Sequence, residues 1–296
     1  MELAMQRKIG KLKKEDQGRL VLSCPNQPGI VAEVTRFLYE READIIQIEQ
    51  HMDEHFFLRV VFQCDQFERR IEEIRQQFAP IAESYEMQWR MVSAARKHRL
   101  AIFVSKEGHC LQDLLWRFQT GELEAEISMV ISNHADLKPL VEPYGIPYYH
   151  VPVTKETREE AARIHMELLE PAKIDTIILA RYMQIIPSWM TQRYRHQIIN
   201  IHHSFLPAFA GAKPYHRAYE RGVKMIGATA HYVTEELDQG PIIEQDVKRV
   251  DHRYSVEDLK RIGRDIERIV LARAVRWHIQ DQVMVDGNRT IVFSGI

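Results

Sequence analysis

The order of apolar segments along the chain changes near residue 98, and this change constrains the fold more than any other feature. Before that point, segments with strand and helix periodicities follow one another in the order β-α-β-β-α-β. After it, strands alternate with longer amphipathic helices. The polar segment AARKH separates the two patterns. The sequence therefore predicts an α/β protein of two domains, with residues 18–93 in the first and residues 99–296 in the second.

The first domain has the periodicities of a ferredoxin-like fold. Apolar residues alternate in four of its segments, which predicts strands, and recur every three to four residues in two others, which predicts helices. The order β-α-β-β-α-β is that of the split βαβ unit. The predicted strands are residues 19–25, 43–52, 55–64 and 86–94, and the predicted helices are residues 28–42 and 67–82.

The second domain has the pattern of a Rossmann-like sheet. Strands that alternate with helices form a mostly parallel sheet that helices cover on both faces. Its predicted strands are residues 99–105, 126–133, 148–153, 176–182 and 198–204, and its helices include residues 111–118 and 158–170. The tail departs from this alternation. It predicts late strands at 225–234 and 241–250, a long helix at 255–280, and a hairpin at 283–293 that turns at Asp286-Gly287.

Composition excludes several classes of function. The 296 residues are 45% apolar and 28% charged, as in an ordinary globular protein, and the net charge of −2 gives no bulk attraction to nucleic acid or to an anionic membrane. No apolar run is long enough to span a membrane. Three cysteines, Cys24, Cys64 and Cys110, lie far apart, which predicts a reducing cytoplasm. The basic leader, residues 1–17, lacks the apolar core of a signal peptide, so we expect a mobile lead-in.

The stretch NIHHSFLPAFAGAKPYH, Asn200 to His216, gathers polar side chains at the end of a predicted strand. Asn200 and His202 are two residues apart and so project from the same face, whereas His203 is expected to point the other way. Adjacent histidines in a strand do not easily bind one ion, and no nearby Cys or Glu completes a ligand set. The sequence therefore predicts no metal here.

A third polar group decides between a structural and a catalytic interpretation of this pair. Asp238 follows a late strand in HYVTEELDQGPII. An amide and a protonated imidazole stabilise a developing oxyanion, while a carboxylate orients or deprotonates a water. The chain has no G-x-S-x-G, G-x-x-x-x-G-K-[ST] or G-x-G-x-x-G segment, so a serine nucleophile, a nucleotide triphosphate and a dinucleotide are disfavoured.

Three segments, LARYMQIIP, NIHHSFLPAF and GATAHYVTEELDQGPII, together resemble the folate-dependent formyltransferase family. The resemblance implies that Asn200, His202 and Asp238 form the catalytic trio. It also implies that the substrate is 10-formyltetrahydrofolate, with no bound cofactor. The residues that the resemblance places at the folate are Arg181, Tyr182, Met183, Gln184 and Ile185, together with His231 and Val233.

One departure from the family's ribonucleotide transferases indicates the acceptor. Those enzymes cradle a phosphate in a glycine-rich loop after the first strand, whereas this chain has VSKEGHCLQDLL, with Gly108 alone and the acidic Glu107. When the site for an amine acceptor is lost, water takes its place as the acceptor of the formyl group. The expected reaction is hydrolysis to formate and tetrahydrofolate, which supplies formate for purine synthesis and balances the one-carbon folate pool.

The front domain supports the same expectation. CPNQPGIVAEVTRFL resembles the opening of an ACT domain, whose first loop binds a small amino acid, and with it the chain resembles the formyltetrahydrofolate deformylases. The resemblance implies an effector at Asn26, Gly29 and Ile30, with methionine and glycine as candidates, and a homo-oligomer. Two alternatives remain: a formyltransferase for another amine, and a non-catalytic amino-acid sensor. Roles for Lys213 and His216 stay open.

Overall fold

The computed structural model describes residues 13–208 and 214–295, and it divides the chain into two compact units after Lys97. Among the described residues, no helix is both long and apolar enough to cross a bilayer. The three cysteines are buried and free.

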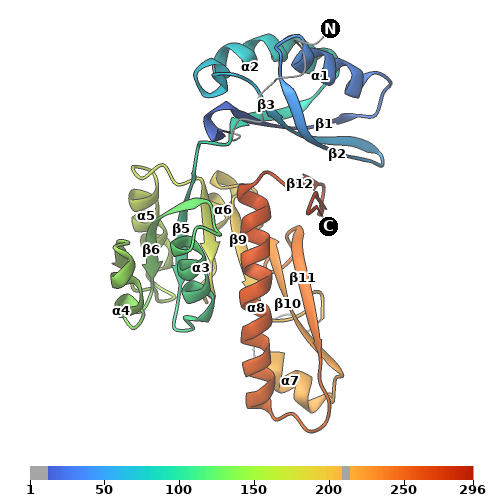
Figure 1. The fold of residues 1–296 in the computed structure, drawn as a ribbon. Helices are drawn as coiled ribbons and strands as arrows, with labels where there is room; N and C mark the ends of the chain where they lie inside the picture. The colour runs from blue at the N-terminus through green and yellow to red at the C-terminus, as the bar shows by residue number, and fades with distance from the viewer. Residues whose placement is uncertain (1–12, 209–213, 296) are drawn as a thin grey trace. The chain divides into compact units, whose positions relative to one another are not determined.

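The first unit confirms the predicted β-α-β-β-α-β order (Figure 1). Its strands form an antiparallel four-stranded sheet in the order β2-β3-β1-β4, and α1 and α2 cover one face. The core arises from the predicted alternation, because Leu20, Leu22 and Cys24 all turn toward the helices. The elements are β1 (Gln17–Pro25), α1 (Ile30–Tyr39), β2 (Asp44–Met52), β3 (His55–Gln63), α2 (Phe67–Ser84) and β4 (Gln88–Ser93).

The second unit is built on a seven-stranded sheet in the order β11-β10-β9-β8-β5-β6-β7. The strands from β7 to β9 in this order run parallel, whereas β10 is antiparallel to both β9 and β11. The prediction of a mostly parallel sheet is confirmed. The strands are β5 (His98–Val104), β6 (Ala125–Ser132), β7 (Tyr148–His150), β8 (Thr176–Leu179), β9 (Ile198–His202), β10 (Met225–Tyr232) and β11 (Ile242–Arg249).

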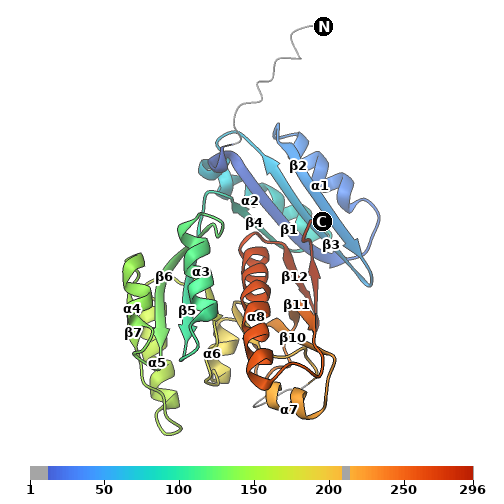
Figure 2. The same ribbon diagram turned by 60° about the horizontal axis from the view of Figure 1, so that its bottom comes forward.

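Helices cover both faces of this sheet. On one face α3 and α8 lie side by side (Figures 1 and 2), and on the other face α5 and α6 pack. Strand β5 is apolar on both sides and therefore needs helices on both faces. Leu100 and Ile102 enter one core, while Ala101 and Phe103 enter the other. The helices are α3 (His109–Gln119), α4 (Lys138–Val141), α5 (Arg158–Leu169), α6 (Ser188–Arg193), α7 (Pro214–Glu220) and α8 (Val256–Ile279), and β12 (Val283–Asp286) and β13 (Arg289–Val292) form the predicted hairpin.

Several predicted boundaries were wrong. Strand β8 ends at Leu179 because Arg181 adopts a left-handed backbone with φ of 64°, so residues 180–182 belong to a loop. Strand β7 likewise stops at His150. Helix α1 begins at Ile30, because Gly29 before it has φ of 94°. In the leader, residues 14–16 form a 3₁₀ turn and β1 begins at residue 17, while residues 1–12 lie outside the described part.

Candidate active site

A cavity of about 290 Å³ opens where β9, the loop after β8 and the loop after β10 meet. The three predicted catalytic residues, Asn200, His202 and Asp238, all line it. Asn200 and His202 lie on β9, and Asp238 reaches them from the loop that joins β10 to β11. Its remaining lining residues are Leu179, Tyr182, Met183, Gln184, Ile185, Ile186, His203, His231, Val233, Thr234, Glu235, Glu236 and Leu237.

The amide of Asn200 is held by a hydrogen-bonded chain. His231 lies opposite Asn200 in the β9–β10 pairing, and its Nδ1 donates to the carbonyl oxygen of Tyr232 at 2.9 Å. Burial lowers the pKa of His231, so its Nε2 is an acceptor and takes a hydrogen bond from Asn200 Nδ2 at 3.2 Å. One N–H of Asn200 is therefore fixed, and the other is left to face a ligand.

His202 and Asp238 form the second contact of the site. His202 Nδ1 lies 3.3 Å from Asp238 Oδ1, and both side chains are largely buried. The hydrogen bond from His202 lowers the pKa of Asp238 and outweighs burial, which acts in the opposite direction. The site thus holds a charged carboxylate against an imidazole, as a pair that moves protons requires.

The loop that carries Asp238 depends on Gly240. Asp238 has φ of 57°, and the chain returns to the sheet through Tyr232 N, which donates to Pro241 O at 2.9 Å. A Cβ on Gly240 would lie 1.8 Å from the carbonyl oxygen of Tyr232, closer than any real contact. Only glycine lets the backbone approach this closely, and so the carboxylate reaches the cavity.

The loop after β8 forms the apolar side of the cavity. Met183 N donates to Ser105 Oγ at 3.0 Å, and Ser105 in turn donates to Asn133 Oδ1 at 2.7 Å, which anchors the loop to the end of β5. The side chains of Met183 and Ile185 are about half exposed at 57% and 50%. Exposed apolar side chains beside a few fixed polar groups are typical of a small-molecule site.

Arg181 does not line this cavity, although the sequence placed it at the folate. Its Nε lies 3.5 Å from the carboxylate of Glu267 on α8, which is 1% exposed. Glu267 also accepts from Tyr215 Oη at 2.7 Å and lies 2.7 Å from His109 Nε2. Burial alone would raise the pKa of Glu267, but His109, Arg181 and Tyr215 outweigh it and lower that pKa. These four residues, the Glu267 cluster, tie α3, α7 and α8 to the loop after β8.

His203 lies where the sequence did not predict it. Strand β9 ends at His202, so the alternation that was expected to turn His203 away does not extend to it. His203 instead lines the same cavity as the trio. The sequence carried no signal for this difference, because apolar periodicity does not fix the last residue of a strand.

The remaining candidates lie elsewhere. Lys213 is outside the described residues, and His216 is exposed on α7 and does not line the cavity. In the first unit, Asn26 and Gly29 are exposed at the turn before α1, whereas the Ile30 side chain is buried in the core.

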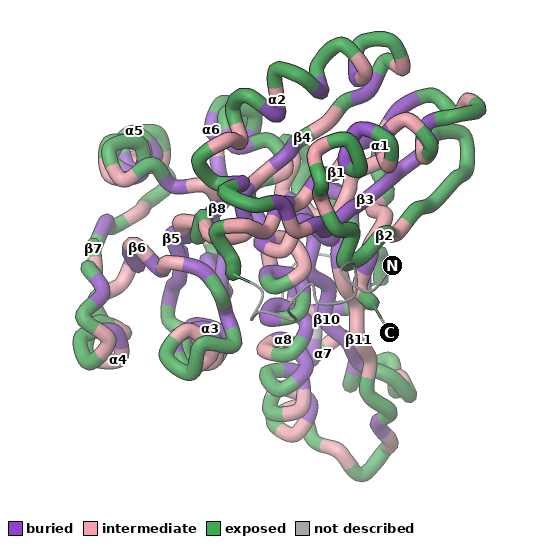
Figure 3. The backbone as a smooth tube through the Cα atoms, turned by 45° about the horizontal axis from the view of Figure 1, so that its top comes forward, coloured by how far each residue is buried: buried purple, intermediate pink, exposed green. Residues whose placement is uncertain are grey.

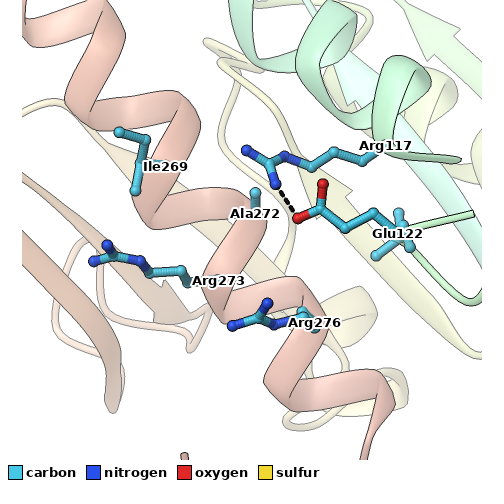
Figure 4. A pocket seen from close by; sticks show the side chains of 7 residues that line it. Arg117, Glu122, Ile269, Ala272, Arg273 and Arg276 are labelled. Atoms are coloured by element: carbon cyan, nitrogen blue, oxygen red, sulfur yellow. Dashed lines mark hydrogen bonds and ion pairs between the residues drawn. The ribbon is translucent and has the colours of Figure 1, made fainter. Parts of the chain in front are cut away.

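A separate groove lies between α3 and α8, where Arg117, Arg273 and Arg276 gather (Figure 4). Arg117 forms an ion pair with Glu122 there. None of the residues that line this groove also lines the cavity of the trio, so the groove is no part of that site.

Comparison with known proteins identifies both units. Residues 98–275 match the Formyl transferase family, and residues 18–79 match the ACT domain. The "Formyltetrahydrofolate deformylase" of Bacillus subtilis (strain 168) is 53% identical over 95% of this chain and 95% of its own length. The crystal structure of a formyltetrahydrofolate deformylase from Pseudomonas syringae pv. tomato is 50% identical, with a TM-score of 0.92, and the match covers 94% of each chain.

A more distant match covers a smaller share of this chain. The structure of glycinamide ribonucleotide transformylase 1 from Symbiobacterium toebii is 29% identical with a TM-score of 0.62, and it covers 66% of this chain and 94% of that one. The fold and the site thus define a formyltransferase-fold enzyme that carries an ACT domain. Within that class, the chain belongs to the formyltetrahydrofolate deformylase family.

Proposed function

We propose that this protein hydrolyses 10-formyltetrahydrofolate to formate and tetrahydrofolate in the cavity of Asn200, His202 and Asp238. The observation that carries the proposal is the convergence of these three side chains in one cavity, from a strand and from a separate loop. The expected apolar face for a pterin ring is the loop of Tyr182 to Ile185, with Val233 opposite.

In the proposed reaction, a water oxygen attacks the formyl carbon and one proton of that water passes to Asp238. The free N–H of Asn200 and the protonated His202 stabilise the oxyanion of the tetrahedral intermediate. His202 then gives its proton to the departing folate nitrogen, and the C–N bond breaks. Asp238 returns the proton it received to His202, and formic acid ionises to formate. No redox step and no covalent enzyme intermediate is needed.

Water is favoured over a phosphorylated amine by the charges at the start of α3. Glu107 lies 3.7 Å from His109 Nδ1, and Glu267 lies on the other nitrogen of the same ring. A phosphate would need positive charge or free N–H groups there, but the nearby Arg181 is already paired with the buried Glu267, and Glu107 adds negative charge. No other acceptor is favoured by a comparable observation.

The test is formate release from purified protein with 10-formyltetrahydrofolate and no added amine. Formate should form stoichiometrically with tetrahydrofolate. Turnover that starts only when an amine is supplied would instead establish the transferase alternative. If neither water nor an amine supports turnover, the non-catalytic amino-acid sensor is the alternative that remains.

We further propose that residues 18–93 regulate and residues 99–296 catalyse. The turn at residues 26–30 presents backbone N–H groups at the start of α1, which suits the carboxylate of an amino acid such as methionine or glycine.

Strand β2 supports a homo-oligomer, because it is a sheet edge exposed along nearly its whole length (Figure 3) and it carries the exposed Ile46, Ile48 and Met52. Formate supply for purine synthesis and a cytoplasmic location belong to the same proposal; the free cysteines support the latter.

A further inference from the structure

His203 is a polar group of the cavity that the proposed mechanism does not use. Its ring lies beside that of His202, with centroids 5.1 Å apart and planes tilted by 46°. It lines both the cavity of the trio and an adjacent apolar cavity of about 260 Å³. Its other ring neighbour is Tyr215, at 6.2 Å. Among the described residues, neither of its ring nitrogens has a hydrogen-bond partner.

Burial, assisted by nearby positive charge, keeps His203 neutral. Burial lowers the pKa of His203 to about 3, and the positive charges of Arg181 and His202 act in the same direction. The carboxylates of Glu267 and Asp238 oppose this shift but do not overcome it. At neutral pH the ring therefore has one nitrogen that accepts a hydrogen bond and one that donates.

Each of the other two histidines of the cavity already uses at least one ring nitrogen in a contact with the protein. His231 donates from Nδ1 to Tyr232 O and accepts at Nε2 from Asn200. His202 contacts Asp238 through Nδ1, and its buried Nε2, which has no hydrogen-bond partner among the described residues, is the nitrogen left for the oxyanion in the proposed reaction. Of the three histidines that line the cavity, His203 is the one with both nitrogens open to a ligand within the described residues.

Hydrolysis gains from a group with this property. A water is held with one lone pair directed at the formyl carbon most firmly when both of its hydrogens have acceptors. Asp238 takes one hydrogen as a proton. An uncharged second acceptor leaves that proton to Asp238, and the neutral imidazole of His203 lines the same cavity as Asp238.

We propose that His203 is a further catalytic residue, whose neutral ring nitrogen accepts a hydrogen bond from the attacking water while Asp238 removes the other hydrogen. No bond to His203 forms or breaks. The role rests on the proposed hydrolysis and explains how water is placed in a cavity whose other side is apolar.

The experiment replaces His203 and lets a second nucleophile compete with water. His203→Phe keeps a ring but removes both nitrogens, and His203→Asn keeps an acceptor oxygen. Each variant is given 10-formyltetrahydrofolate with and without hydroxylamine, and formate and formohydroxamate are both measured. For His203→Phe, kcat for hydrolysis should fall about 10²-fold with KM little changed. The ratio of hydroxamate to formate should rise by about tenfold or more, because hydroxylamine does not need the lost acceptor.

The matched controls separate this role from packing. His203→Asn should recover part of the hydrolysis. His196→Asn alters another half-buried histidine, near the start of β9, whose pKa is also lowered by burial, and it should leave both products unchanged. If formate and hydroxamate fall in parallel, or if neither changes, His203 does not hold the water. That result leaves the proposed hydrolysis standing, whereas a wild-type protein that releases no formate without an amine overturns the proposed function itself.

Discussion

The two candidate sites of this protein differ in how their polar groups are held. In the catalytic unit, His202 and His231 are 5% and 2% exposed, and hydrogen bonds fix the Asn200 amide. In the ACT unit, the turn at residues 26–30 is open. Within the described part of the chain, its one side-chain hydrogen bond runs from Gln27 Nε2 to the Tyr85 carbonyl oxygen at 3.3 Å, and α1 has no side-chain cap.

This difference separates two tasks. A site that stabilises a transition state gains most from groups already in place, because no reorganisation is needed during the reaction. A regulatory site must bind one functional state better than another, and it responds only if it can change. The account therefore predicts large losses of rate in the buried site and modest, ligand-dependent effects at the open turn.

The largest effects should come from the trio. Asn200→Ala removes an oxyanion donor and should lower kcat about 10²–10³-fold. His202→Ala and Asp238→Asn each remove a proton carrier and should cost about 10²–10⁴-fold. Folate binding, measured by calorimetry, should remain. A double variant should lose far less than the product of the single losses, since the three act as a unit. If the losses of the single variants multiply in the double variant, the residues act independently and their roles are structural.

The second effect concerns the loop that carries Asp238. Gly240→Ala places a methyl group against the Tyr232 carbonyl oxygen, so the loop must shift. A misplacement of about 1 Å at a catalytic group lowers the rate by about 10²-fold, and we expect that loss in kcat while the protein stays folded by circular dichroism. Gly121→Ala is the control for backbone strain alone, since Gly121 has φ of 76° and a Cβ there meets nothing within 4 Å; this variant should lose some stability and keep its kcat. A normal kcat for Gly240→Ala would mean that the close contact between Gly240 and the Tyr232 carbonyl oxygen does not position Asp238.

The sequence predicted the sheet and pointed to Asn200, His202 and Asp238, which the structure brings together in one cavity, because strand periodicity and three separate motifs agree on them. It did not predict the Glu267 cluster. Arg181 and Glu267 meet only because α8 packs beside β9 and β10, and neither residue's neighbours in sequence indicate the other. The expectation that His203 points away from Asn200 and His202 was wrong only in part, since His203 lines both their cavity and the adjacent apolar cavity. The sequence predicts the helices and strands well, but it predicts poorly which side chains of different elements come into contact.

The third effect is regulatory and should be smaller. At least one of the twenty amino acids should change the rate or the substrate affinity, by roughly 5–150-fold as in typical couplings. Gly29→Val should weaken that response and leave the basal rate near normal. Gly29 has φ of 94°, and a Cβ there would lie 3.1 Å from Tyr85 Oη. If no amino acid binds the full-length protein in a calorimetric titration, the ACT unit has no sensor role.

The smallest expected effect is that of chelation. His109, Cys110 and Glu267 bring possible ligand atoms within 4.8 Å of one another, but Glu267 already contacts His109 and Arg181 adds positive charge beside it. We therefore expect activity to survive exhaustive treatment with EDTA. Activity lost on chelation and restored by zinc or iron would contradict this expectation and would assign the Glu267 cluster to a metal.

The identity of the acceptor is tested most directly by turnover in water enriched in ¹⁸O, with no amine present. Because the attacking oxygen comes from water, formate should carry one ¹⁸O atom per turnover and should match tetrahydrofolate in amount. His203→Phe and Asp238→Asn should lower both products together under these conditions. Formate without the label, or tetrahydrofolate formed only after an amine is added, would contradict the assignment of water as the acceptor.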